Sequence, residues 1–437
     1  MIKKIIKKIL PERALSFYHY IVTGSATLFY GLPSKKMIVI GVTGTKGKTS
    51  TSNFIWSALT AGGKKVGMIT SANIRIGKEE KINNYHMTML GRFKNQKMIK
   101  KMKEKGCEIV IIETTSEGLK QHRDNGVYYD VAIFTNLSPE HLPSHGGSFE
   151  NYKKMKGKMF DKLSTEKNID GEKIEKVIIA NEDDEHSSYF LDFESDKKVT
   201  FSLEANSNYK AENISEKEDG VDFTLGDDNF EIKICGRFNV YNALPAIALC
   251  DLFQIDREKA VEGINNLKKI PGRMEKIKKD QDFTVFVDYA HEQKSIKKAL
   301  ETVKNLKDEQ GRVIVLLGAE GGGRDESKRP LMGEISGELA DYVIVSNVDP
   351  YETDPQEIAE EIALAAERKG KEKGESLFVI EERKKGIRKA LSLAEKGDMV
   401  LITGKGAEQS ITVDGETRQW DDREVIREEL EREGYSL

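Results

Sequence analysis

The sequence predicts a multidomain α/β protein, and three observations support this. From Lys36 onward, short β-branched runs alternate with longer helical patterns, which is typical of parallel sheets with crossover helices. A glycine-rich segment follows the first of these runs, where a phosphate-binding loop would join a strand to a helix. The length of 437 residues fits two or three domains of roughly 150 residues. We expect a P-loop-type central ATPase domain with a parallel sheet, followed by a Rossmann-like α/β domain.

Composition narrows the possible functions. The 69 Lys and Arg residues and 73 Asp and Glu residues leave a net charge of -4, which gives no global attraction to nucleic acid. Hydrophobic residues make up 38% of the chain, enough for folded cores. Cys107, Cys235 and Cys250 lie far apart without a CxxC spacing, so we predict neither disulfides nor a zinc site. A cytoplasmic enzyme without a nucleic-acid partner fits best.

The amino-terminal segment 1–35 differs from the rest. Lysines alternate with Ile and Leu up to Pro11, and a semi-apolar aromatic run follows over residues 15–32. Polar residues and glycines dilute that run below a convincing membrane span of about 20 apolar residues. Two interpretations remain open. The segment forms a pair of helices packed on the first domain, or it is a basic amphipathic anchor giving weak membrane association.

The strands predicted after this segment fall into two sets. An alternating pattern at 221–225 and 230–234 separates them and predicts a β-hairpin. We therefore divide the chain into residues 1–35, 36–270 and 271–437. The first set of strands lies at 37–42, 108–113, 131–135 and 177–180, and the second at 284–287, 313–317, 342–346, 377–380 and 399–403.

The glycine-rich segment 40–50 predicts a phosphate-binding loop. Its backbone N–H groups and the following helix N-terminus would face phosphate oxygens. Lys48 would neutralise the outer phosphates, and the Thr49 hydroxyl would reach Mg²⁺. Val42 stands where the strict P-loop pattern has glycine, so an ordinary glycine-rich turn is the alternative. The residues expected to hold nucleotide here are Gly44, Thr45, Lys46, Gly47, Lys48, Thr49 and Ser50.

The segment TGTKGKTS resembles the ATP loop of the Mur ligase superfamily, and other blocks of the chain agree with it. The resemblance is strongest to the MurE branch, the UDP-N-acetylmuramoyl-tripeptide synthetases. It implies that ATP activates a carboxylate as an acyl phosphate, which the amino group of an amino acid then attacks. The supporting blocks, in chain order, are IETTSEGLKQHR, FTNLSPEHLPSHG, GRFNVYNALPAIAL, GRMEKI, VDYAHEQKSIKKAL, RDESKRPLM, DPYETDP, GKGAEQ and DDREVIREEL.

The resemblance also implies roles for residues outside the loop. Glu113 and His141 would hold Mg²⁺ together with Thr49. Lys156 aligns with the lysine that Mur ligases carry as a carbamate, although a solvated basic helix face is the alternative. The residues implied in catalysis are Lys48, His141, Lys156 and Arg273, and those implied in nucleotide binding beyond the loop are Asn242, Arg273 and Asp288.

Substrate residues follow from the same resemblance. Diaminopimelate-adding relatives carry Asp-Asn-Pro-Arg where this chain has Asp349 and Tyr351 in the places of Asn and Arg, so a bidentate grip on a carboxylate is missing. Glu408 matches the acid that receives a distal amino group, and a diamino acid therefore fits. The residues implied are Thr115, Gln121 and Arg123 for the muramoyl-peptide acceptor, and Asp349, Tyr351, Gly404 and Glu408 for the amino acid.

The main departure from MurE enzymes is at the front, where the usual UDP-binding domain is not found before the ATP loop. The acceptor is then held by its peptide and sugar alone, or is not a UDP-sugar. We expect an ATP- and Mg²⁺-dependent ligase of peptidoglycan precursor synthesis. The alternatives are a folylpolyglutamate- or cyanophycin-type ligase acting on another carboxylate, and a nucleotide-binding regulatory protein without the chemistry.

Overall fold

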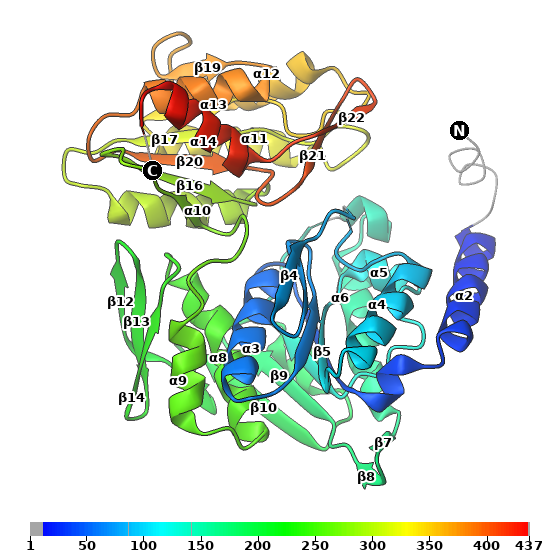
Figure 1. Ribbon diagram of the computed structural model, residues 1–437. Coiled ribbons are helices and arrows are strands. Elements are labelled where there is room, and N and C mark those ends of the chain that lie inside the picture. Colours follow the sequence, from blue (N-terminus) through cyan, green and yellow to red (C-terminus); the bar gives the residue numbers. More distant parts are fainter. Residues whose placement is uncertain (1–11, 86, 141, 436–437) are drawn as a thin grey trace. The chain divides into compact units, whose positions relative to one another are not determined.

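A computed structural model describes residues 12–85, 87–140 and 142–435 (Figure 1). The chain divides into two compact units. The first comprises Met1–Ser215, Asp222–Ile232 and Phe238–Leu267, and the second comprises Glu216–Val221, Lys233–Arg237 and Lys268–Leu437. The domain limits drawn from the sequence stay predictions.

The first unit is built on a nine-stranded sheet of order β11-β10-β9-β6-β1-β5-β2-β3-β4. The strands from β9 to β2 pair in parallel, and β3 and β4 continue the sheet beyond β2 with antiparallel pairing. The predicted strands of the first set are present, whereas β2–β4, β10 and β11 were not predicted. The strands are β1 Ile38–Thr43, β2 Val66–Ile69, β3 Asn73–Ile76, β4 Glu79–Ile82, β5 Ile109–Glu113, β6 Val131–Phe134, β9 Val177–Asn181, β10 Lys197–Ser202 and β11 Tyr209–Lys210.

Helices and shorter elements complete this part of the chain. A three-stranded sheet, β12-β13-β14, contains the two strands predicted as a hairpin. The helices are α2 Glu12–Phe29, α3 Lys48–Ala61, α4 Arg92–Glu104, α5 Ser116–Lys120, α6 Phe149–Asp161, α7 Ser187–Leu191, α8 Phe238–Leu252 and α9 Arg257–Asn265, with short 3-10 turns Pro33–Lys36, Leu142–His145 and Lys162–Ser164. The remaining strands are β7 Asn168–Ile169, β8 Glu172–Lys173, β12 Glu212–Lys217, β13 Gly220–Leu225 and β14 Asp228–Ile232.

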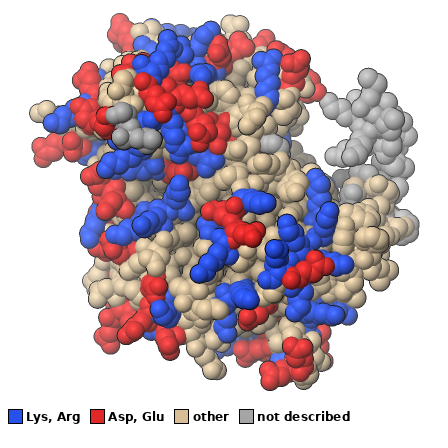
Figure 2. Space-filling view, viewed as in Figure 1, with Lys and Arg blue, Asp and Glu red and all other residues tan. Residues whose placement is uncertain are grey.

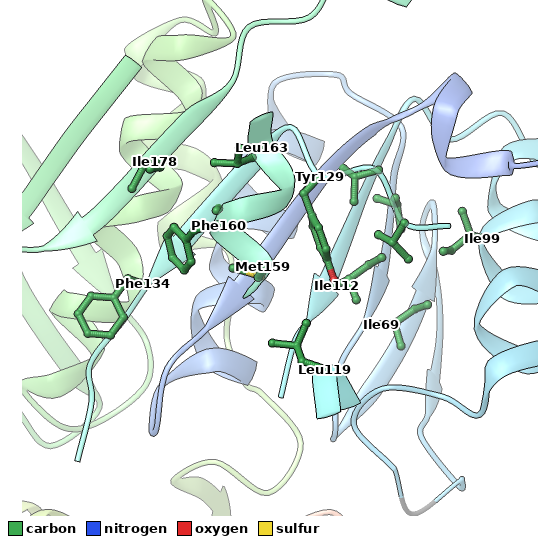
Figure 3. Packing of buried hydrophobic residues seen from close by; sticks show 14 of the residues in the cluster. Ile69, Ile99, Ile112, Leu119, Tyr129, Phe134, Met159, Phe160, Leu163 and Ile178 are labelled. Carbon is green, nitrogen blue, oxygen red and sulfur yellow. The ribbon is translucent and has the colours of Figure 1, made fainter. Parts of the chain in front are cut away.

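The hydrophobic core of the first unit fixes the central strands against α6. Figure 3 shows Met159 and Phe160 of the helix between Tyr129 on one side and Phe134 on the other. A Cβ atom at Gly41 would lie 2.6 Å from the Met159 sulfur and 2.8 Å from the Tyr129 ring. Only glycine therefore fits in the middle of β1 without displacing these side chains. This close packing fixes the position of α6 relative to β1.

Helix α2 contacts α4 and the segment that follows α5. The small side chain of Ala26 is buried, and Thr27 Oγ1 lies 3.1 Å from the carbonyl oxygen of Asn125. This is one helix of the predicted amino-terminal pair; the basic residues 1–11 lie outside the described part of the chain. Within residues 12–85, 87–140 and 142–435, no helix is long and apolar enough to cross a bilayer.

The second unit contains a six-stranded sheet of order β15-β16-β20-β17-β18-β19. All pairs are parallel except β15 with β16, and the predicted strands of the second set are present. Its strands are β15 Glu275–Ile277, β16 Thr284–Asp288, β17 Val313–Leu317, β18 Tyr342–Val345, β19 Leu377–Val379 and β20 Met399–Thr403. A separate antiparallel pair consists of β21 Ser410–Val413 and β22 Glu416–Gln419. The helices are α10 Gln293–Leu306, α11 Lys328–Leu339, α12 Pro355–Glu367, α13 Arg383–Ser392 and α14 Asp422–Arg432. The chain is thus α/β throughout, as predicted.

Candidate active site

The glycine-rich loop joins β1 to α3 and has the backbone of a phosphate-binding loop. Gly44 and Gly47 have φ values of 148° and 84°, which favour glycine. The Thr45 N–H donates to the carbonyl oxygen of Asn136 at 2.8 Å, and the Lys46 N–H donates to its side-chain oxygen at 2.9 Å. Asn136 follows β6, so these bonds fix the loop to the end of a neighbouring strand. Ser50 lies in the first turn of α3, where its side chain is largely buried.

Lys48 is the first residue of α3 and folds back over the loop. Its ammonium donates to the carbonyl oxygens of Gly44 at 3.0 Å and Thr45 at 2.7 Å. The positive charge thus lies at the helix N-terminus, where backbone N–H groups already favour an anion. This combination is suited to the outer phosphates of a nucleotide.

A carboxylate and two hydroxyls meet beside the loop. Parallel pairing sets Val42 opposite Glu113, so β1 and β5 end at the same edge of the sheet. Glu113 accepts a hydrogen bond from the Thr49 hydroxyl at 2.9 Å and from the Ser71 N–H at 2.8 Å. The hydroxyls of Thr49 and Ser71 lie 2.9 Å apart. These are hard oxygen donors of the kind that Mg²⁺ prefers.

Ser71 was missed by the sequence analysis because the strand before it, β2, was not predicted. Once β2 is placed beside β5, Ser71 follows at the same sheet edge as Glu113. His141, the other predicted metal ligand, lies outside the described residues.

Lys156 brings an amine from α6 into the same loop. Its Nζ donates to the Gly44 carbonyl oxygen at 2.7 Å and lies 4.5 Å from the centre of the Tyr152 ring. Only 2% of the residue is exposed. Burial, and then the positive charge of Lys48, hold the pKa of Lys156 well below its usual value. The solvated helix face considered from the sequence is therefore wrong for this residue.

Asn242 approaches the loop from α8. A Cβ atom at Gly47 would lie 2.5 Å from the Asn242 side-chain oxygen. That oxygen accepts from the Thr51 hydroxyl at 3.4 Å, and the Asn242 amide donates to the Asn239 side chain at 2.9 Å. Asn242 is thus placed directly against the phosphate loop, although 195 positions separate it from Gly47 in the sequence.

The three residues implied in acceptor binding lie together after β5. The Thr115 hydroxyl accepts from the Gly118 N–H at 3.1 Å and caps α5. The Arg123 guanidinium donates to the Gln121 side-chain oxygen at 3.2 and 2.7 Å and to the Met89 carbonyl oxygen at 2.9 Å. Arg123 is therefore held in one orientation by its neighbours, and such an arginine is suited to binding a carboxylate or phosphate.

In the second unit, Arg273 and Asp288 lie at the edge formed by β15 and β16. The Arg273 guanidinium lies 4.4 Å from the centre of the Tyr289 ring. Asp288 accepts from the backbone N–H groups of Met274 and Ala290, both at 2.8 Å. Asp288 thus connects the chain after β16 to the chain before β15. Its bond to the Met274 N–H fixes the backbone next to Arg273.

An ionic cluster lies where β18 and β20 end. Lys405 Nζ is 2.7 Å from carboxylate oxygens of both Asp349 and Glu408. The Tyr289 hydroxyl donates to Glu408 at 3.4 Å, and the Thr412 N–H donates to Asp349 at 2.7 Å. Burial raises the pKa of Glu408 despite the nearby ammonium of Lys405. The charge of Glu408, and then burial, raise the pKa of Tyr289 well above its ordinary value.

The sequence analysis assigned Asp349 and Glu408 to amino-acid binding and did not single out Lys405 or Tyr289. Gly404, which was predicted, has a φ of 104°, and a Cβ atom there would lie 2.8 Å from Val348. Tyr351 has a left-handed φ of 55° and lies near Arg324, whose guanidinium is 5.9 Å from the centre of the Tyr351 ring. An arginine from a different loop is thus placed next to the position where relatives were expected to carry one.

A phosphate-binding loop with a lysine, two hydroxyls and a carboxylate beside it is typical of nucleotide-binding enzymes, and the chain is assigned to that class. Family comparisons identify the branch. Residues 42–250 match the Mur ligase middle domain, and residues 272–406 match the Mur ligase glutamate ligase domain. The chain belongs to the Mur ligase family and is an ATP-dependent ligase that forms amide bonds.

Curated relatives match over nearly the whole chain. A "UDP-N-acetylmuramyl-tripeptide synthetase" from Roseiflexus sp. (strain RS-1) is 36% identical over 94% of this chain and 82% of its own length. A "UDP-N-acetylmuramoyl-L-alanyl-D-glutamate--2,6-diaminopimelate ligase" from Geobacillus kaustophilus is 35% identical over the same shares. The similarity thus extends through both family domains.

Solved structures share the fold. A UDP-N-acetylmuramoyl-L-alanyl-D-glutamate--2,6-diaminopimelate ligase superposes with a TM-score of 0.61 at 27% identity, covering 92% of this chain and 79% of its own. The folylpolyglutamate synthase of Mycobacterium tuberculosis superposes with a TM-score of 0.69 at 19% identity, covering 88% of this chain and 92% of its own. At that lower identity the likeness concerns the fold alone.

Proposed function

We propose that this enzyme adds an amino acid to the free carboxylate of a muramoyl-peptide acceptor such as UDP-N-acetylmuramoyl-L-alanyl-D-glutamate. The observation that carries the proposal is the 36% identity to a tripeptide synthetase over 94% of the chain. The reaction consumes ATP and a nucleotide-linked sugar peptide, so we also propose a cytoplasmic location and a role in peptidoglycan precursor synthesis.

The proposed chemistry has two steps. The acceptor carboxylate attacks the γ-phosphorus of ATP, giving an acyl phosphate and ADP. The amino nitrogen of the second substrate then attacks the acyl carbon, the C–O bond to phosphate breaks, and the amide forms with loss of a proton and inorganic phosphate. Lys48 and the loop N–H groups would hold the phosphates, with Asn242 beside them. The family resemblance also assigns Arg273 and Asp288 of the second unit to nucleotide binding.

The residues beside the loop fit a divalent cation. Thr49 and Glu113 offer hard oxygen donors at one sheet edge, and His141 completes the proposed set. Bound Mg²⁺ would offset negative charge on the triphosphate and the acceptor carboxylate. The role of the protein is to hold these oxygens at the end of β5 and α3, next to the phosphates.

Lys156 fits the lysine carbamate expected from the family resemblance. The nitrogen lone pair of a neutral amine attacks CO₂, an N–C bond forms as one C–O π bond breaks, and the nitrogen loses one proton. An ammonium has no free lone pair, so it cannot react. The lowered pKa of Lys156 favours the neutral form. The resulting anion would lie next to Gly44 and Lys48, where it would orient the phosphate loop and its cation.

We propose a diamino acid as the amine substrate. Asp349 and Glu408 place two carboxylates around one ammonium, Lys405, so the cluster retains one negative charge. A second ammonium from the substrate would balance that charge. Position 351 carries tyrosine instead of arginine, and Arg324 beside Tyr351 is the candidate for binding a substrate carboxylate.

Release of ADP tests the substrate class. We expect turnover only when UDP-N-acetylmuramoyl-L-alanyl-D-glutamate and a diamino acid are both present with Mg-ATP. Turnover with a folate polyglutamate acceptor instead would favour the folylpolyglutamate-type alternative. ATP binding without turnover on either acceptor would favour the nucleotide-binding regulatory protein.

A further inference from the structure

In the part of helix α2 whose side chains are described, several large apolar residues lie on the outside. Leu28 and Phe29 are 76% and 75% exposed, and Tyr18 and Ile21 are about half exposed. With 3.6 residues per turn, these four positions share one face of the helix. The opposite face, which lies against the rest of the unit, carries the small or polar residues Thr23, Ala26 and Thr27. This is the reverse of the usual surface helix.

Three hydroxyl groups of α2 donate to carbonyl oxygens of the same helix. Ser25 is on the outer face, and its hydroxyl donates to the Ile21 carbonyl oxygen at 3.0 Å. Thr23 and Thr27 bond in the same way to carbonyls one turn earlier, both at 2.8 Å. Such back-bonding lets hydroxyl residues enter an apolar medium without leaving an unsatisfied donor.

Helix α4, which contacts α2, is strongly basic. Its sequence RFKNQKMIKKMKE contains six basic residues and one acidic residue. Lys94, Lys97 and Lys101 are exposed and follow the spacing of one helix face, while Ile99 and Met102 face the core. In Figure 2 the surface at the position of α2 is tan, and Lys and Arg side chains gather beside it.

Aromatic residues connect the two helices. The Phe93 ring at the start of α4 lies 6.4 Å from the Tyr30 ring just after α2. Lys94 Nζ lies 4.4 Å from the centre of the exposed Tyr85 ring. Aromatic rings with adjacent lysines are typical of surfaces that lie at the boundary between lipid headgroups and acyl chains. In sequence, the eleven residues before α2 add four lysines and no acid.

We propose that the outer faces of α2 and α4 form a docking surface for an anionic lipid bilayer. The apolar residues of α2 would enter the headgroup boundary, and the lysines of α4 would lie over the anionic headgroups. Charge complementarity favours a bilayer over a second copy of the chain, because two copies facing each other would bring basic helices together. The surface goes beyond the proposed reaction and does not depend on it.

Sedimentation with vesicles tests this surface. The full chain should bind vesicles of equal parts phosphatidylglycerol and phosphatidylcholine, bind phosphatidylcholine vesicles weakly, and dissociate as salt is raised. The double variant Leu28→Ser/Phe29→Ser should lose about tenfold in affinity or more. The triple variant Lys94→Glu/Lys97→Glu/Lys101→Glu should also lose at least about tenfold.

Matched controls exclude a general loss of folding or hydrophobicity. Leu331 and Leu364 are exposed leucines of α11 and α12 in the second unit, and the double variant Leu331→Ser/Leu364→Ser should bind vesicles like the unaltered chain. All variants should keep their thermal unfolding midpoint. Absence of vesicle binding by the unaltered chain at low salt would overturn the proposal. A dimer that Leu28→Ser/Phe29→Ser dissociates, without vesicle binding, would also overturn it and assign the face to a second copy.

Discussion

The ammonium nitrogen of Lys156 lies 2.7 Å from the carbonyl oxygen of Gly44, so a buried lysine of α6 contacts the first glycine of the phosphate loop. The contact joins two segments 112 positions apart in the chain. It places an amine with a lowered pKa next to the loop that is proposed to bind the phosphates of a nucleotide. The geometry explains why the proposed carbamate at Lys156 would act on the loop.

Replacement of Lys156 tests that relationship. We expect Lys156→Met to reduce ligase activity by about a thousandfold or more, since it removes the group proposed to orient the phosphate loop and its cation. Short carboxylates that restore part of the activity would support the carbamate. The control is Lys158→Met on the exposed side of the same helix, which should leave activity within about twofold.

The pH dependence of carbamylation follows from the same pKa. Because the pKa of Lys156 lies well below 10.5, the amine is neutral at a lower pH than an exposed lysine. Carbamate, measured by ¹³C NMR with labelled bicarbonate, should decrease as the pH falls through that lowered pKa. Activity should decrease over the same range and recover with added bicarbonate. A carbamate signal that persists in Lys156→Met would contradict the assignment.

Loss of the Glu113 carboxylate should weaken the cation site. Glu113→Gln keeps the size of the side chain but removes the charge beside Thr49. We expect the Mg²⁺ concentration for half-maximal activity to rise at least about tenfold. The exposed Glu104→Gln of α4 is the matched control. An unchanged Mg²⁺ requirement in Glu113→Gln would remove this residue from the proposed metal set.

Glu408 should govern the affinity for the amino acid. The substitution Glu408→Gln is expected to raise KM for the diamino acid about tenfold or more, because a charged partner is lost, and to leave KM for ATP unchanged. Burial raises the pKa of Glu408 above 4.5. The carboxylate therefore protonates earlier as the pH falls, and KM for the diamino acid should rise below that pKa. Glu416→Gln on the exposed strand β22 should change neither constant.

Stability of the first unit depends on one buried carboxylate. Asp130 pairs with Lys167 at 2.5 Å and Lys176 at 2.9 Å, and all three are buried. Asp130→Asn would leave two buried ammonium groups without their anion. We expect a loss of about 3–5 kcal/mol in the free energy of unfolding. Denaturant titration measures it, and Asp170→Asn in an exposed turn with a φ of 52° should have little effect.

Strand periodicity and one glycine-rich loop were enough to predict the α/β class and the position of the phosphate loop. These features are local, since strand patterns and loop glycines are encoded in adjacent residues. Ser71 could not be found in the same way. It joins Glu113 and Thr49 only through the pairing of β2 with β5, and β2 is a four-residue strand with no distinct pattern.

The ionic cluster of the second unit also depends on tertiary structure. Asp349 follows β18 and Lys405 follows β20, so 56 positions separate the partners of a 2.7 Å contact. The sequence indicated the two acids through resemblance but gave no reason for the lysine between them. The inverted apolar face of α2 was likewise hidden, because an apolar run does not show which side faces the protein.

Mass spectrometry of the reaction product tests the central proposal most directly. The pure 437-residue chain would be incubated with Mg-ATP, UDP-N-acetylmuramoyl-L-alanyl-D-glutamate and a mixture containing lysine, diaminopimelate and the other amino acids. We expect one new mass, equal to the acceptor plus one diamino acid minus water, together with ADP and phosphate. An adduct with a different class of amino acid would contradict the proposed role of Glu408, and the absence of any adduct on this acceptor would contradict the proposed reaction.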